Sequence, residues 1–151
     1  VMVLDSTDRS IIRALCEDAR LSQRQLAQIV GVAQGTIANR IRKLEEDGAI
    51  QGYAPILGAE EVGWGMTVMA GLCSEKGMMM DVQRQISADQ RVFSVYDVTG
   101  DWDSMVLARV KDREDLDDLT KSVFTLKGIS RSYTHVVLNT VKESGVRLPK
   151  E

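Results

Sequence analysis

The clearest chemistry in this sequence of 151 residues lies in the segment from Ser22 to Tyr53. Between Leu21 and Leu44 the chain carries four basic residues and no Asp or Glu. Guanidinium, ammonium, amide and hydroxyl groups are the ones that bind phosphate oxygens and the base edges of DNA. The segment is therefore a candidate DNA-reading surface. Its candidate contact residues are Arg24, Gln34, Thr36, Asn39, Arg40, Arg42 and Lys43.

Hydrophobic spacing predicts how these groups are displayed. Residues 22–30 are predicted to form a short helix and, after a tight turn, residues 34–47 a second one. In the second helix Ile37, Ile41 and Leu44 make one narrow buried stripe, and the polar groups fall on the opposite face. Basic residues alone are more typical of a solvated helix face. The turn, the stripe and the charge together favour DNA binding.

A further helix precedes this pair, predicted from about Asp5 to Asp18 with an aliphatic buried face. Ser22 and Gln25 have the spacing of a capping box at the start of the next helix. Residues 49–54 alternate between apolar and polar types, as a short strand does. Three helices followed by a short strand predict a winged helix-turn-helix domain over residues 1–53.

The rest of the chain has a different pattern. Pro55 and Gly58 mark a linker over residues 54–64. After it, the predicted elements alternate as strand, helix, strand, strand, helix, strand, at residues 65–73, 78–88, 92–99, 104–110, 112–126 and 130–139. This βαββαβ order is that of the ferredoxin-like fold, which we assign to residues 65–151. The fold class is therefore α+β, with a winged helix-turn-helix domain followed by a ferredoxin-like domain.

The first predicted strand of this second domain is apolar on both faces. Residues 66, 68, 70 and 72 are apolar, and the residues between them are hardly more polar. A sheet with one solvated face normally shows apolar and polar residues in alternation along each strand. Two helices cover only one face of such a sheet. We therefore expect a partner subunit on the other face and a homo-oligomer.

Charge and composition narrow the function further. The net charge of −3 argues against an indiscriminate polyanion binder. Residues 1–53 hold seven basic and seven acidic groups, so the excess acid lies in the second part. Cys16 and Cys73 lack metal-ligand or redox spacing, and we expect both to be buried thiols in a reducing compartment. No metal, cofactor, signal peptide or membrane span is predicted, and the expected location is the cytoplasm.

Four stretches in order resemble the leucine-responsive regulator/asparagine-regulator (Lrp/AsnC, feast/famine) family. The stretches are Leu4-Asp5-x-x-Asp8-x-x-Ile11-Ile12-x-x-Leu15; Leu26-Ala27-x-x-Val30-Gly31-Val32; Arg40-Ile41-x-x-Leu44-Glu45-x-x-Gly48-x-Ile50-x-Gly52-Tyr53; and Thr99-Gly100-x-Trp102-Asp103. Together they cover essentially the whole chain. The resemblance implies a transcription regulator that binds double-stranded DNA, joined to an oligomerisation domain that senses amino acids.

Ala33 and Gly58 depart from the family pattern. Ala33 stands where the family usually has Ser, so the recognition helix lacks a capping oxygen worth about 1 kcal/mol. Gly35 lowers helix propensity in the first turn by up to about 1 kcal/mol. We therefore expect this helix start to order fully only against DNA. Gly58 replaces an Asp that is frequent in the family's linker.

By position, the resemblance implies that Gln34, Thr36, Asn39 and Arg42 face the major groove. Asn39 would bind adenine and Arg42 guanine, each with two hydrogen bonds. Arg24, Arg40 and Lys43 would bind phosphate or support the helix. For Arg40, an internal salt bridge to a helix acid such as Glu17 or Asp18 is an equal alternative.

The resemblance places an amino-acid effector near the turn Gly100-Asp101-Trp102-Asp103. Gly100 offers a backbone N–H group, Asp101 or Asp103 an anion for the ammonium group, and Ser132 and Thr134 hydroxyl groups. The alternative is an ordinary hairpin turn, in which Trp102 packs and Asp103 bonds to local backbone N–H groups. For Asp103 this structural role is favoured. The single histidine, His135, is expected at the surface or an interface.

Two other classes of function are weighed. A ferredoxin-like enzyme would need a catalytic set, but Asp101 and Asp103 have no visible partner base. An RNA-binding domain would need an aromatic platform, and Phe93, Tyr96 and Tyr133 are scattered. DNA-binding regulation therefore remains the main hypothesis, with no catalytic residues. The effector, the operator and the choice between dimer, tetramer and octamer stay open.

Overall fold

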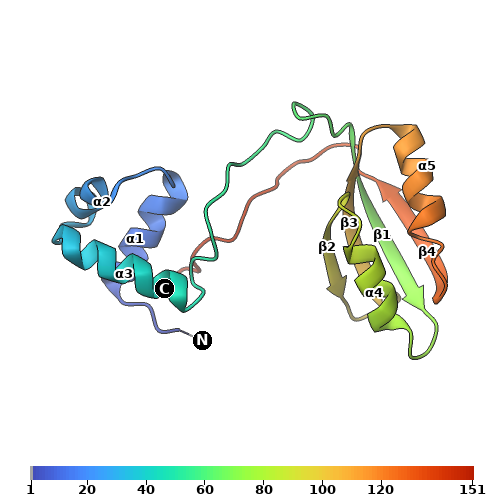
Figure 1. Cartoon of the computed structure of the whole chain (residues 1–151), viewed down its shortest axis with the longest axis horizontal. Helices are drawn as coiled ribbons and strands as arrows, with labels where there is room; N and C mark the ends of the chain where they lie inside the picture. Colours follow the sequence, from blue (N-terminus) through green and yellow to red (C-terminus); the bar gives the residue numbers. More distant parts are fainter. Residues whose placement is uncertain (1) are drawn as a thin grey trace. The chain divides into compact units, whose positions relative to one another are not determined.

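The structure, a computed structural model, describes residues 2–151 and divides them into two compact units. The first unit holds the described residues up to Pro55 together with Glu143–Glu151, and the second is Ile56–Lys142. The first unit contains α1 (Ser6–Glu17), α2 (Gln23–Val30) and α3 (Gln34–Glu46) (Figure 1). The second contains β1 (Met66–Ser74), α4 (Met79–Ser87), β2 (Val92–Asp97), β3 (Ser104–Val110), α5 (Arg113–Ser122) and β4 (Ile129–Val136).

The three helices of the first unit begin and end as their sequences dictate. The side chain of Ser22 accepts from the backbone N–H of Gln25 at 3.1 Å, and the Gln25 side chain accepts from the Ser22 N–H at 2.9 Å. This confirms the predicted capping box. α2 ends at Gly31, whose φ of 81° is readily available only to glycine. The helices enclose a small core of Ile11, Leu26, Ile37 and Leu44.

The predicted strand over residues 49–54 is wrong for this structure. In the described part of the first unit Ala49 and Ile50 form a bend and residues 51–54 have no regular structure, and no other strand lies beside them. The Ile50 N–H instead donates to the Leu44 carbonyl oxygen at 3.0 Å, and the Tyr53 hydroxyl donates to Glu45 at 3.2 Å. The chain thus folds back on the end of α3.

The C-terminal segment Glu143–Glu151 departs from the expected organisation, in which it belonged to the second domain. Arg147 Nη1 donates to Glu17 on α1 at 2.9 Å, and Arg9 Nε lies 3.2 Å from Glu151 Oε1. Leu148 is half-buried in an apolar groove that Ile12 and Leu15 also line. No periodic pattern in the sequence signals this segment, because its only apolar anchor is a single leucine.

The second unit has the predicted βαββαβ order and the ferredoxin-like sheet order β2-β3-β1-β4, with every neighbouring pair antiparallel. α4 and α5 pack on one face of the sheet (Figure 1). The core between them consists of Val68, Ala70, Leu72, Val82, Ile86, Val106, Ala108, Val110, Leu119, Val123 and Phe124. α5 is shorter than predicted and ends at Ser122, and Leu126 packs against the core from the following turn.

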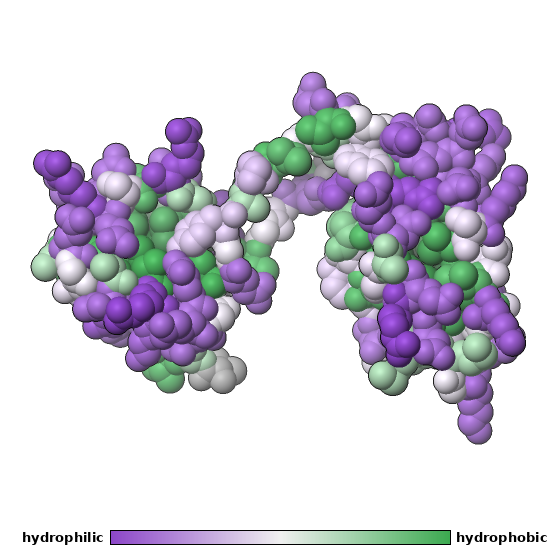
Figure 2. All heavy atoms as spheres, in the orientation of Figure 1, coloured by the Kyte–Doolittle hydropathy of each residue, from purple (hydrophilic) through white to green (hydrophobic). Residues whose placement is uncertain are grey.

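The other face of the sheet is open in a single chain. Along β3 the burial alternates strictly, so Met105, Leu107 and Arg109 lie on the open face. Met69, Tyr96 and Tyr133 are apolar or aromatic side chains with substantial exposure there. The segment that leads into β1 also exposes apolar residues, seen as green spheres along it in Figure 2. These are Ile56, Leu57 and Val62.

The C-terminal segment yields the first prediction. Leu148→Ala removes part of the apolar cover of α1 and should raise the amide exchange rate of α1 about fivefold, equivalent to about 1 kcal/mol of lost protection. Val141→Ala is the matched control, because Val141 is 91% exposed and lies outside the groove. Hydrogen exchange of the full-length chain is the measurement. Equal exchange in both variants would contradict a supporting role for Leu148.

Candidate DNA-binding surface and ligand-binding turn

The exposed face of α3 carries the predicted DNA contacts. Gln34, Asn39, Arg42 and Lys43 are exposed and Thr36 is half-buried, whereas the opposite face holds the buried Ile37 and Leu44. The helix begins after Ala33, which makes no side-chain capping hydrogen bond. The first turn of α3 therefore presents backbone N–H groups that no side chain caps.

Asn39 and Arg42 are hydrogen-bonded to each other. Arg42 Nη2 donates to Asn39 Oδ1 at 3.1 Å, and Arg42 Nε lies 4.0 Å from Glu46 Oε1. The pair therefore forms a polar cluster one turn long on the exposed face. Lys43 and Arg24 are exposed, and within residues 2–151 neither makes a hydrogen bond or ion pair with a side chain.

Arg40 lies on another side of the helix. Its guanidinium forms ion pairs with Asp5 and with Asp8 Oδ1, the latter at 3.4 Å. Asp8 is 5% exposed, and the pKa of Asp5 is lowered first by the Asp8 backbone N–H and then by Arg40. The internal salt bridge is thus present, but its partners are not Glu17 or Asp18. Arg40 ties α3 to the start of α1.

Asp103 ties the turn between β2 and β3 to β1. The Asp103 N–H donates to the Leu72 carbonyl oxygen at 2.9 Å, and the Asp103 carboxylate accepts from the Ser74 N–H at 2.9 Å. Asp103 therefore has a structural role, but its carboxylate bonds to the N–H of Ser74 on β1 and not to the local backbone N–H groups that were predicted. Gly100 has a φ of 105°, in the region that favours glycine, and nothing lies within 4 Å of an added Cβ.

Trp102 lies against the open face of the sheet at Gly71. A Cβ on Gly71 would lie 2.5 Å from the indole Cδ2, so only glycine leaves room for the ring. The Tyr133 ring centroid lies 6.1 Å from that of Trp102, and His135 lies 4.8 Å from Tyr133. An aromatic row therefore extends from the turn along β4, with His135 at the surface as expected.

Arg131 completes this cluster, and sequence analysis missed it. Its guanidinium carbon lies 4.6 Å from the Trp102 ring, and Nη2 donates to the Asp101 carbonyl oxygen at 3.4 Å. Its Nη2 also lies 3.8 Å from the Cys73 sulfur. Alternation within residues 130–139 puts Arg131 and Tyr133 on one face, but only the pairing of Arg131 with Cys73 brings them to the turn.

Ser132 and Thr134 do not join this cluster. They pair with Leu72 and Ala70, both of which face the helices. Directly paired residues of an antiparallel sheet share a face, so these hydroxyl groups lie on the opposite side from Trp102. The predicted effector set is therefore split between two faces.

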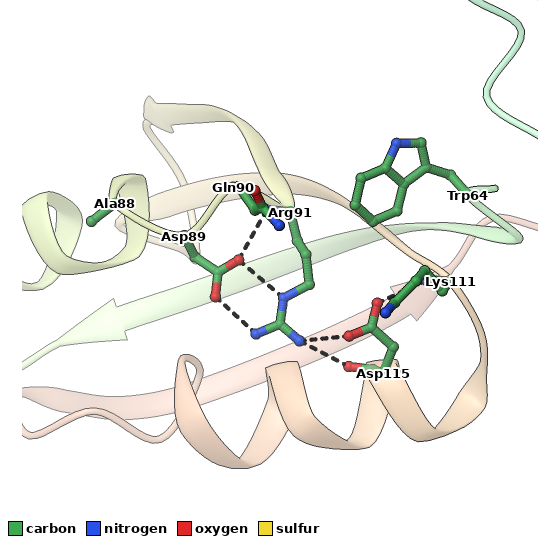
Figure 3. A pocket seen from close by; sticks show the side chains of 7 residues that line it. All are labelled: Trp64, Ala88, Asp89, Gln90, Arg91, Lys111 and Asp115. Carbon is green, nitrogen blue, oxygen red and sulfur yellow. Dashed lines mark hydrogen bonds and ion pairs between the residues drawn. The ribbon is translucent and has the colours of Figure 1, made fainter. Parts of the chain in front are cut away.

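A separate hollow lies around Arg91 (Figure 3). Trp64, Lys111 and the loop after α4 line it, and Arg91 donates to Asp89, Asp115 and Asp118 at 2.8 to 2.9 Å. The Lys111 N–H also donates to Asp115 at 2.8 Å. The carboxylates around the hollow therefore already have donors from within the chain. Their bonds to Arg91 connect the loop between α4 and β2 to α5.

Other expectations concern metals, cysteines and membranes. Over residues 2–151 no group of three or more His, Cys, Asp or Glu side chains could hold a metal ion. Cys73 is half-buried as a free thiol, but Cys16 is exposed, so its expected burial is wrong. Among the described helices, none has the length and apolar character needed to cross a bilayer.

Comparison with known proteins agrees with this architecture. Residues 4–51 match the family described as winged helix-turn-helix DNA-binding, and residues 67–147 match the Lrp/AsnC ligand binding domain. The chain belongs to the Lrp/AsnC family. An uncharacterised HTH-type transcriptional regulator of Pyrococcus abyssi is 43% identical to it over 141 residues, which are 93% of this chain and 96% of the relative. This Lrp/AsnC chain is thus a DNA-binding transcription regulator with a ligand-binding domain.

Solved structures show the same fold as this Lrp/AsnC chain. The leucine response regulatory protein LrpA of Mycobacterium tuberculosis is 27% identical, with a TM-score of 0.85, covering 97% of this chain and 100% of that one. A Neisseria meningitidis transcriptional regulator solved with L-Met has a TM-score of 0.90 at 24% identity and covers 97% of each chain. At that identity the second likeness supports the fold alone.

The packing of Trp102 gives a prediction. In a Trp64→Phe background, where Trp102 is the only tryptophan, Gly71→Ala should shift the emission maximum and lower the free energy of unfolding by about 1–3 kcal/mol. The cause is the clash between the new Cβ and the indole. Gly145→Ala, at a position with open space around it, serves as the control. Unchanged emission in the Gly71 variant would show that Trp102 does not rest there.

The Arg91 network gives a second prediction. Hydrogen bonds from Arg91 lower the pKa of Asp89, so this network stabilises the fold above the ordinary carboxyl pKa of about 4 and loses that effect as the pH falls through the lowered value. Arg91→Met should cost about 2 kcal/mol at pH 7 and progressively less below pH 4.

Urea unfolding at several pH values measures this effect. Arg84→Met is the matched control, because Arg84 pairs only with the exposed Asp81 and should change stability by less than about 0.5 kcal/mol. Profiles of Arg91→Met and the unaltered protein that run parallel from pH 7 to pH 3 would exclude an electrostatic role for Arg91.

Proposed function

We propose that this Lrp/AsnC protein binds specific double-stranded DNA sites as an oligomer and that an α-amino acid changes its DNA affinity or its assembly. The observation that supports DNA binding is the arrangement of side chains on the exposed face of α3. There Asn39 and Arg42 form a hydrogen-bonded pair beside the exposed Lys43, while Arg40 is held by two acids of the first unit. Side chains that bind bases and side chains that support the helix are thus on different sides of α3.

Each exposed group has a distinct role in this proposal. Asn39 and Arg42 read base edges in the major groove, where an amide matches adenine and a guanidinium matches guanine. Gln34 and Thr36 approach the groove from the start of α3, which is helical from Gln34 onward although no side chain caps it. Lys43 and Arg24 neutralise phosphates, which adds affinity without sequence preference.

The open sheet face supports an oligomer. Exposed Met69, Tyr96 and Tyr133 on that face would be covered by the same face of a second copy. A dimer presents two copies of α3 to two half-sites, so its affinity exceeds that of one unit. Assemblies larger than a dimer would use other surfaces.

An amino acid is the proposed effector because the ligand-binding domain match covers residues 67–147. The names of two similar proteins agree, since one is a leucine response protein and the other was solved with L-Met. We place regulation rather than catalysis in this domain. The similar curated proteins are named regulators, and Asp103 is already held by the Ser74 N–H.

The DNA-binding roles are tested with separate variants of α3. Asn39→Ala and Arg42→Ala should each cost about 1–3 kcal/mol at the preferred site and relax specificity. Lys43→Ala should weaken binding to all sequences and lower the salt slope by about one. Because Asn39 and Arg42 are hydrogen-bonded, their double variant should lose less than the sum of the two.

Site selection with purified protein, followed by binding titrations at several salt concentrations, measures these effects. Arg20→Ala is the control, since Arg20 is exposed on the same unit but outside α2 and α3. If Lys43→Ala changed the preferred sequence while the other two variants did not, the assignment of the α3 face would be reversed. No preference for duplex DNA would overturn the function itself.

A further inference from the structure

The hydrogen bond between Asn39 and Arg42 limits what the Asn39 amide can read. A guanidinium carries only donors, so the Asn39 atom that accepts from Arg42 Nη2 at 3.1 Å is the amide oxygen. A free amide matches adenine because it accepts from N6 and donates to N7 of that base at the same time. In this pair the acceptor is already used, and only the two N–H groups of the amide nitrogen remain for a base.

Every group that the pair still offers is therefore a donor. Besides the amide nitrogen of Asn39, these are Nη1 of Arg42 and the second hydrogen of its Nη2, which form no hydrogen bond over residues 2–151. In the major groove adenine shows one acceptor and one donor, whereas guanine shows two acceptors, O6 and N7. A surface made of donors alone complements guanine and is mismatched to the N6 amino group of adenine.

Arg42 is also held from both sides along α3. Asn39 lies one turn before it, and Glu46, one turn after it, has a carboxylate oxygen 4.0 Å from Arg42 Nε. The Arg42 side chain nevertheless remains 69% exposed, so a base edge can reach it. Exposed pairs at this spacing add little to the stability of a helix. What they set is the direction of the guanidinium, and a side chain that is already oriented loses less entropy when it binds.

We propose that Asn39 and Arg42 read guanine as one unit. Arg42 donates to O6 and N7 of the guanine, and Asn39 is a positioning residue that orients Arg42 and does not read adenine. This inference rests on the proposed function and names the base that this part of α3 recognises. It narrows the separate preferences that an amide and a guanidinium have when each is free.

Base analogues test the proposal with the full-length protein. Site selection first gives the preferred duplex, in which each guanine is then replaced singly by 7-deazaguanine and each adenine by 7-deazaadenine. Both analogues lack the N7 acceptor. The guanine that Arg42 reads is the one whose replacement weakens binding of the unaltered protein about tenfold but leaves binding of Arg42→Ala unchanged. In Asn39→Ala the effect at this same guanine should fall below about threefold, because Arg42 is no longer oriented, while the effect at every adenine stays the same.

Asn39→Asp separates orientation from base reading. Aspartate keeps an acceptor for Arg42 but has no donor of its own. The variant should therefore keep the roughly tenfold effect at the same guanine, although its binding to all sequences weakens because a carboxylate faces the phosphates. Gln28→Ala is the matched control, because Gln28 is an exposed amide on α2 and lies outside the proposed surface. It should leave the effect of every analogue unchanged, and thermal unfolding of each variant shows that it is folded.

Three outcomes would overturn the paired reading while sequence-specific binding, and with it the proposed function, stands. Loss of an effect at an adenine in Asn39→Ala, with the effect at the Arg42 guanine unchanged, would show that the two residues read bases separately. If no guanine effect disappeared in Arg42→Ala, Arg42 would not read guanine. A lost guanine effect in Asn39→Asp would show that the Asn39 acceptor does not orient Arg42. In contrast, the absence of any preferred duplex would overturn the proposed function and the paired reading with it.

Discussion

Two helices cover only one face of a four-stranded antiparallel sheet, and this constraint determines where the second unit can hold polar chemistry. The covered face is filled by aliphatic side chains from β1 and β3, with α4 and α5 against them. The open face has room for the aromatic rings and the guanidinium beside the turn. Trp102 reaches that face because Gly71 leaves room for its ring, and Arg131 and Tyr133 reach it by alternation along β4. The cluster beside the turn is thus a consequence of incomplete cover.

The first unit has a very small core, so its stability depends on contacts outside that core. Four fully buried side chains hold three helices together, and domains of this size are marginally stable without further contacts. Two features add to the core. Arg40 joins α3 to the start of α1 through Asp5 and Asp8, and the segment Glu143–Glu151 covers part of α1. Since Arg40 is used inside the unit, Arg42, Lys43 and Arg24 are the remaining basic residues of the proposed DNA-binding surface.

Local patterns in the sequence predicted much of this structure, and contacts between distant residues explain the rest. The capping box at Ser22 and the stripe of Ile37 and Leu44 depend on neighbours within one or two turns, so they were predictable. Strand alternation shows which residues share a face but not which face is covered. For this reason Ser132 and Thr134 were wrongly grouped with the turn, and Arg131 was overlooked until the register with β1 was known.

The DNA-binding and ligand-binding parts are connected covalently at two places, and the second connection follows directly from β4. The strand that carries Arg131 continues through residues 137–142 into the segment that contacts α1. Chain continuity alone does not couple two sites, because coupling needs an element whose states differ in free energy. The C-terminal segment is a weakly held element. One half-buried leucine and exposed ion pairs attach it to α1, and exposed ion pairs contribute little individually.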